Sequence, residues 1–350
     1  MSSAIAPCLD AIEFRWDYDF PGAKRTAQNR FSPARIRPLG HIARRALRWL
    51  GMGFTAGIAL LVSWAAHADD QSYSMPDTKV IPFASKDGSR EYRLFIGLPR
   101  DYDKRTTERF QTIYLLDADY AFPLAQEMLR HATDRGQLKE AIVVGIAYPG
   151  ADRDLNVYEL TRTRDYSPTY SATGGYGPET QKVSGGGPAF LRLLKTELLP
   201  YIDANFRTRP DDRMIVGHSY GALFTTFAML AEPELFQHYL VVSPSLWYDN
   251  RSAYTRADRY IASHRSLHAD VFYAVGAFEN HPGGETMVDD LKAWDAKLAA
   301  AHLKGYRATL MVFDGDIHNS VFPAALGRGL RVLDDFAGEA AGNRLENAAK

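Results

Sequence analysis

The sequence predicts one α/β domain with a mostly parallel central sheet, an N-terminal antiparallel hairpin and helices on both faces. Two short runs rich in β-branched and aromatic residues flank the turn signal KDGS at 86–89, which is typical of a hairpin. Beyond it, short apolar runs alternate with longer helical patterns, and no internal repeat interrupts them. Such alternation indicates a parallel sheet that is covered on both faces.

The predicted elements follow in order along the chain. The hairpin strands are TKVIPFAS at 78–85 and REYRLFIGLP at 90–99. Later strands are predicted at 110–117, 141–149, 213–219, 239–245, 271–276 and 306–314, where short apolar runs occur. Helices are predicted at 121–135, 188–205, 220–231, 252–264, 285–302 and 320–338, where apolar residues recur with helical spacing.

One long segment, 150–187, departs from this alternation. It is rich in Tyr, Gly, Ser and Thr and has no apolar period. A segment of this length without regular structure, inside a compact domain, is usually functional or disordered. We predict that it is an active-site loop.

The N-terminal part has the features of an export signal. A basic region precedes the 16 apolar residues Gly51–Ala66, and a small-x-small site ends at Ala68. We predict a signal peptide at 44–68, a disordered or wrongly assigned extension at 1–43, and a mature, periplasmic domain at 69–350. An uncleaved membrane anchor is the alternative, although the run is shorter than the roughly 20 residues that span a bilayer.

Charge and cysteine content exclude several classes of function. Residues 1–68 hold nine Lys/Arg and four Asp/Glu, which leaves 32 Lys/Arg against 38 Asp/Glu in the mature part. This acidic balance, without a basic tract, argues against a nucleic-acid partner. The only cysteine is Cys8, so the mature part has no disulfide framework, thiol nucleophile or Cys-based zinc site. We predict no metal and no cofactor.

The stretch Gly217-His218-Ser219-Tyr220-Gly221 matches the pattern G-x-S-x-G. In this pattern a serine occupies a sharp turn between a strand and a helix, where glycines avoid clashes with neighbouring backbone. A predicted strand precedes the stretch, and the helical run ALFTTFAML follows it. We therefore predict that Ser219 is a nucleophile, whereas the alternative is a small residue in a tight turn.

A serine nucleophile needs a base and an orienting acid, which follow it in the chain in this kind of fold. His318 lies in a loop directly after the last predicted strand, and Glu279 lies three residues beyond the strand at 271–276. We predict that His318 is the base and that Glu279 orients it. Asp314 and Asp316 are closer to His318 in sequence and are the alternative acids.

The oxyanion of such a reaction needs two amide donors. One is the amide after the nucleophile, that of Tyr220, and the other comes from the loop after the third strand. In the stretch IYLLDADYAF we assign the second amide to Asp119.

Together these residues resemble a known family. The stretches YLLDADY, GHSYGALF, SPSLWYDN and IHNSV resemble the esterase D group of α/β-hydrolases, whose relatives include formylglutathione hydrolases and antigen 85 mycolyltransferases. With GIAYP, RTRDYSPT and GGGPAFLRLL, the chain looks most like the exported esterases that open siderophore trilactones. It differs from many members by having Gly221-Ala222 after the elbow and by a Glu as the acid.

The resemblance implies a serine esterase that acts on a small-molecule ester, such as a ferric siderophore. A ferric tricatecholate is a trianion with aromatic faces, so Arg162 and Arg164 are candidate binding residues. The alternative is that Arg164 only pairs with Asp165. Trp247 is a further candidate for the pocket wall or, alternatively, a core residue. An esterase or acyltransferase for other esters and a non-catalytic binding protein are the other functional hypotheses.

Overall fold

The computed structural model describes residues 73–281, 284 and 286–348, with side chains as far as residue 336. The described residues form one structural unit. The extension predicted at 1–43 and the signal peptide predicted at 44–68 lie outside the described residues.

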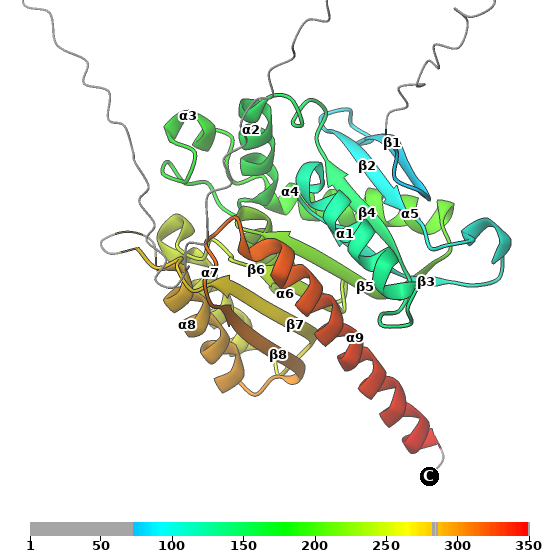
Figure 1. The fold of residues 1–350 in the computed structure, drawn as a ribbon. Helices are drawn as coiled ribbons and strands as arrows, with labels where there is room; N and C mark the ends of the chain where they lie inside the picture. The colour runs from blue at the N-terminus through cyan, green and yellow to red at the C-terminus, as the bar shows by residue number, and fades with distance from the viewer. Residues whose placement is uncertain (1–72, 282–283, 285, 349–350) are drawn as a thin grey trace, which may run out of the picture. The chain divides into compact units, whose positions relative to one another are not determined.

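A central sheet of eight strands organises the described part of the chain (Figure 1). β1 (Thr78–Ala84) and β2 (Glu91–Gly97) form the predicted hairpin, and β2 pairs antiparallel with β4 (Ala141–Ala147). The remaining strands run parallel to β4, and their bounds are Phe110–Leu115 for β3, Thr208–His218 for β5, His238–Val242 for β6, Ser266–Gly276 for β7 and Lys304–Phe313 for β8. The order is β1-β2-β4-β3-β5-β6-β7-β8. The predicted fold class is therefore confirmed.

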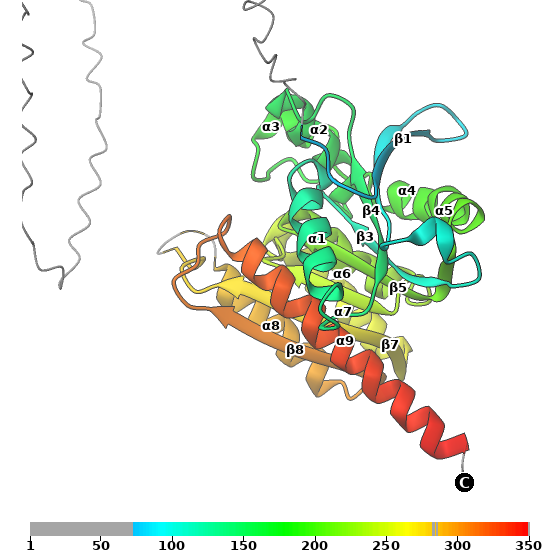
Figure 2. The ribbon, with the colours of Figure 1, turned by 45° about the vertical axis from the view of Figure 1, so that its right-hand side comes forward.

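Helices cover both faces of the sheet, and each face has its own apolar core. On one face lie α1 (Ala118–Thr133) and α9 (Val321–Ala348) (Figures 1 and 2). The other face is covered by α4 (Gly187–Leu193), α5 (Leu199–Asn205), α6 (Tyr220–Ala231), α7 (Tyr248–Ser263) and α8 (Met287–Ala300), with a π-helical turn at Leu194–Leu198 between α4 and α5. Residues 220–230 of α6 are all buried, as expected for a helix that is apolar on every side.

The prediction of a loop at 150–187 was wrong for much of its length. Residues Leu155–Tyr166 form the helix α2, and Pro178–Gln181 form the short helix α3. The side chain of Asp154 accepts a hydrogen bond of 2.9 Å from the amide of Asn156 and caps α2. The sequence analysis missed this helix because the residues that it buries include polar ones. Arg162 and Asp165 are both buried, so the helix has no apolar period.

The parallel arrangement determines where a site can form. The turns that follow β3, β5, β6, β7 and β8 lie at one edge of the sheet, because the carboxyl ends of parallel strands meet there. Segments that are distant in sequence are thereby brought together. None of the helices in the described ranges is long and apolar enough to cross a membrane.

Candidate active site

Ser219 occupies a strained turn between the end of β5 and the start of α6. Its backbone has φ 58° and ψ −119°, which non-glycine residues rarely adopt. Its amide donates to the carbonyl of Val242 on the neighbouring strand, at 3.0 Å. Strain of this kind persists only where surrounding contacts hold the turn, and it is common at functional sites. The predicted strand–turn–helix context of G-x-S-x-G is present.

Close approach of other atoms favours glycine at both flanking positions. A Cβ at Gly217 would lie 2.4 Å from the carbonyl oxygen of Gly221, which is closer than real atoms approach. At Gly221 a Cβ would lie 3.0 Å from a carboxylate oxygen of Asp117. The pattern therefore has the steric origin that the sequence predicts.

His318 is held by Glu279. His318 Nδ1 lies 2.6 Å from Glu279 Oε2, although the two residues are 39 positions apart in sequence. The other oxygen, Oε1, accepts hydrogen bonds of 2.6 Å from both the Ser243 hydroxyl and the Gly276 amide. Glu279 is 2% exposed, and these contacts hold its carboxylate in one orientation. Of the candidate acids, the structure brings Glu279 to the histidine, while Asp316 accepts from Ser320 instead.

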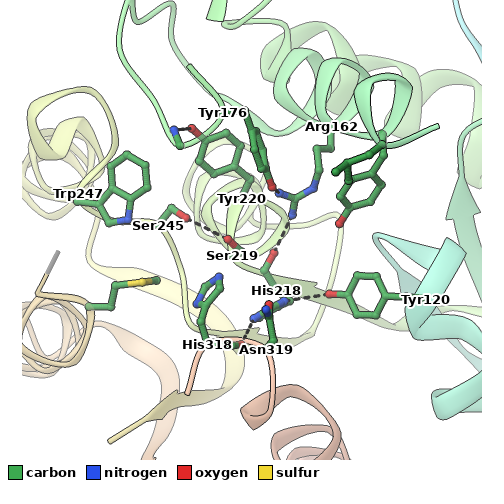
Figure 3. A pocket seen from close by; sticks show the side chains of 14 residues that line it. Tyr120, Arg162, Tyr176, His218, Ser219, Tyr220, Ser245, Trp247, His318 and Asn319 are labelled. Carbon is green, nitrogen blue, oxygen red and sulfur yellow. Dashed lines mark hydrogen bonds between the residues drawn. The ribbon is translucent and has the colours of Figure 1, made fainter. Parts of the chain in front are cut away.

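Ser219 and His318 line the same pocket, which has a volume of about 670 Å³. Figure 3 shows the Ser219 side chain beside Ser245 and the His318 ring. The Ser219 and Ser245 hydroxyl oxygens are 3.4 Å apart, and the described residues contain no direct hydrogen bond between Ser219 and His318. In proteins without substrate such contacts are often long and shorten when substrate binds.

The two predicted oxyanion donors differ in position. Tyr220 is the first residue of α6 and lines the pocket, and the amide of a first helical residue has no partner within its helix. Asp119 lies in the first turn of α1 but is not among the pocket-lining residues. Its neighbour Tyr120 lines the pocket instead. The structure thus brings Tyr220, but not Asp119, to the pocket wall.

His218 is a pocket residue that the sequence analysis missed. Its Nε2 donates to the backbone carbonyl of His318 at 2.8 Å, and its Nδ1 accepts from the Tyr120 hydroxyl at 2.9 Å. Burial, together with the charges of His318 and Arg162, lowers the pKa of His218 well below its usual value. The ring is therefore neutral and has one defined tautomer. Its position inside G-x-S-x-G was the only signal that could have revealed it.

Arg162 lines the pocket but is 2% exposed, and four of its five N–H donors have partners within the protein. Its guanidinium binds Asp117 in bidentate fashion, at 3.0 and 2.9 Å, and also contacts the Tyr176 hydroxyl and the His218 carbonyl. Burial lowers the pKa of Arg162, but the charge and hydrogen bond of Asp117, together with the nearby tyrosines, outweigh burial and raise the pKa above its usual value. Arg162 therefore supports the pocket wall from behind. Asp117 was not singled out in the sequence.

Arg164 is not part of the pocket. Its guanidinium pairs with the adjacent Asp165 at 2.8 and 2.9 Å, and Asp165 also binds Arg90 and the Tyr92 hydroxyl. Arg164 thus forms the pair with Asp165 that the sequence analysis gave as the alternative to a binding role.

Trp247 lines the pocket, as predicted, together with tyrosines from several elements. It stands next to Tyr220, with 6.1 Å between ring centroids. The indole Nε1 is buried and has no hydrogen-bond partner within the described residues. Tyr176, from the segment before α3, packs edge-on against Tyr220 at 5.5 Å. The pocket is thus walled mainly by aromatic rings.

In the described ranges, no group of three or more His, Cys, Asp or Glu side chains is positioned to share a metal ion.

Comparison with known protein families identifies the chain. The family described as "Putative esterase" matches residues 85–331, which is well over half of the sequence. The chain belongs to this esterase family. As a member it is an esterase, and its family match includes Ser219, Glu279 and His318.

Individual relatives extend this result. Ferri-bacillibactin esterase BesA of Bacillus subtilis is 27% identical over 268 residues, which cover 74% of this esterase and 90% of BesA. A siderophore enterobactin esterase of Emericella nidulans is 31% identical over 188 residues, covering 51% of this chain and 61% of its own. A solved IroE-like serine hydrolase from Shewanella oneidensis is 26% identical with a TM-score of 0.65, covering 74% of this chain and 80% of that one. The predicted α/β-hydrolase fold is confirmed.

Proposed function

We propose that this esterase hydrolyses the ester bonds of a siderophore, with Ser219 as nucleophile, His318 as base and Glu279 as the acid that orients His318. The observation that carries the proposal is the 2.6 Å contact of Glu279 with His318 beside the strained Ser219 turn. Relatives named as bacillibactin and enterobactin esterases support the substrate class.

The first half of the reaction forms an acyl-enzyme. Because His318 Nδ1 faces Glu279, Nε2 is the nitrogen that accepts the Ser219 proton as Oγ attacks the ester carbonyl carbon. The Tyr220 amide donates to the oxyanion of the tetrahedral intermediate. When the C–O bond to the alcohol breaks, the imidazolium returns its proton to the departing oxygen.

The second half restores the enzyme. A water molecule attacks the acyl carbon while His318 accepts one of its protons. Collapse of the second tetrahedral intermediate breaks the bond to Ser219 Oγ, which takes the proton back. The net reaction adds one water to one ester and releases an acid and an alcohol. Asp119 remains a prediction for the second oxyanion amide.

The test is product analysis with the purified 69–350 protein. We expect it to convert metal-free enterobactin or triacetylfusarinine C, the siderophores in the names of two relatives from Emericella nidulans and Aspergillus fumigatus, into ring-opened acids, which chromatography with mass spectrometry detects. Ser219→Ala, with unchanged unfolding, should lose activity by roughly 10³-fold or more, because only oxyanion stabilisation and binding remain. Wild-type activity in Ser219→Ala would disprove the nucleophile, and activity confined to p-nitrophenyl esters would disprove the substrate class.

We also propose that the chain is exported to the periplasm, since 44–68 has the order of a secretory signal. Cell fractionation with an antibody against the folded domain tests this proposal. A product cut after Ala68 in the periplasmic fraction is the expected result, whereas full-length protein in the cytoplasm would contradict it.

A further inference from the structure

The pocket contains little positive charge. Arg162 is the one Lys or Arg among the described residues that line it. Its guanidinium is bound by Asp117 on one side and by Tyr176 and the His218 carbonyl on the other. Asp117 balances the charge of Arg162, and four of the five guanidinium N–H donors are used within the protein.

The tyrosines and the tryptophan of the wall are neutral. Burial is the main cause that raises the pKa of Tyr220 to about 12 and the pKa values of Tyr158 and Tyr176 above the usual range. These tyrosines are therefore protonated hydroxyls at neutral pH. The unpartnered Trp247 Nε1 adds a neutral donor that suits a carbonyl or phenol oxygen.

The second arginine of α2 does not supply positive charge to the pocket either. Arg164, which comes from the same helix as Arg162, is bound to Asp165. Residues 69–350 as a whole carry 32 Lys/Arg against 38 Asp/Glu, so the long-range field opposes approach of an anion. At the mouth of the pocket the lining residue Leu155 is apolar and 69% exposed.

A multiply charged ligand loses hydration when it enters such a pocket. Only cations or charge-assisted hydrogen bonds compensate for the free energy of that loss. An uncharged ligand has no such requirement, and aromatic walls bind its rings and esters well. We propose that this esterase selects uncharged siderophore esters, either metal-free catecholates or neutral ferric trihydroxamates, over trianionic ferric tricatecholates. This inference rests on the proposed siderophore esterase function.

Three substrates separate charge from size. Metal-free enterobactin is uncharged because its catechols keep their protons. Ferric enterobactin is bulky and trianionic. Ferric triacetylfusarinine C is bulky but neutral, because three hydroxamates balance Fe³⁺. We expect kcat/KM for both neutral substrates to exceed that for ferric enterobactin by about tenfold or more, a free-energy difference of about 1.4 kcal/mol.

The other possible results of this three-substrate comparison lead to different conclusions. If ferric enterobactin is cleaved as fast as either neutral substrate, the charge inference is wrong while the proposed function stands. If metal-free enterobactin alone is cleaved, size governs selection and the inference also fails. If none of the three is cleaved but a p-nitrophenyl ester is, the proposed function itself is wrong.

A gain-of-function variant provides a second readout. Leu155→Lys places one cation at the pocket mouth, and Leu155→Met is the matched neutral control. With Lys, the ratio of kcat/KM for ferric to metal-free enterobactin should rise roughly fivefold or more, and added salt should reverse the gain. The Met variant should keep the wild-type ratio. An equal ratio in the Lys and Met variants would overturn the inference.

Discussion

His318 is held from two directions by single residues. Glu279 binds its Nδ1 at 2.6 Å, and His218 binds its backbone carbonyl at 2.8 Å. The first contact selects the tautomer, and the second connects the histidine loop to the serine turn, because His218 directly precedes Ser219. Precise geometry at this scale matters, since a misplaced base loses much of its catalytic effect.

Glu279→Gln tests the role of the acid. The Gln carbonyl can still accept from Ser243 and Gly276, which bind Oε1 in the wild type, while its NH₂ group faces His318 Nδ1. That NH₂ favours the wrong tautomer, so we expect kcat to fall by roughly 10³- to 10⁴-fold with little change in stability. Esterase kinetics and urea unfolding measure the two effects.

Asp316→Asn is the matched control, because Asp316 lies in the histidine loop but accepts from Ser320. We expect nearly wild-type kcat in this variant. A larger loss with Asp316→Asn than with Glu279→Gln would mean that Asp316 is the acid.

At the scale of elements, the Arg162–Asp117 pair joins α2 to the turn between β3 and α1. Both side chains are about fully buried, at 2% and 1% exposure. The pair therefore fixes a helix whose own apolar pattern is too weak to position it. This explains why α2, although part of the pocket wall, has so little hydrophobic signal in the sequence.

Arg162→Met should destabilise the protein by about 3–5 kcal/mol, because Asp117 is left as a buried charge without a partner. The double variant Arg162→Met with Asp117→Leu removes both charges and should regain a large part of that loss. Urea unfolding of the wild type, both single variants and the double variant measures the coupling. Strict additivity of the two single effects would contradict the proposed pairing.

At the scale of the whole molecule, one buried histidine links strands at the edge of the sheet opposite the pocket. His238, on β6, lies 3.2 Å from Asp212 on β5 and 3.4 Å from Asp270 on β7, and Arg307 on β8 binds Asp270. Burial lowers the pKa of His238, but the hydrogen bonds and charges of Asp212 and Asp270 outweigh burial and raise it above the usual value.

This raised pKa makes stability depend on pH. The contribution of protonated His238 is fully present below its unfolded-state pKa of about 6.5, and it is lost as the pH rises through the higher folded-state pKa. We therefore expect the stability difference between wild type and His238→Gln to shrink as the pH is raised from about 6 to about 9. Urea unfolding at several pH values measures it.

The control is the same His238→Gln change in a background with Asp212→Asn and Asp270→Asn. That background lacks the two carboxylates that raise the pKa of His238. There the pH dependence should largely disappear. An unchanged pH dependence in that background would show that other groups raise the pKa.

The sequence by itself determined the strand–helix order, the elbow at Ser219 and the positions of Glu279 and His318 after later strands. Each of these features can be recognised within a short stretch of sequence, from the apolar periodicity, from the glycines around the serine or from the place of a residue directly after a predicted strand. Only the tertiary structure decided that α2 is a helix, that Arg162 is bound by Asp117, that Arg164 lies outside the pocket and that Asp119 does not line it. Those outcomes depend on how the chain folds: Arg162 and Arg164 look alike in the sequence, and only folding determines which of them reaches the pocket and which carboxylate each one binds.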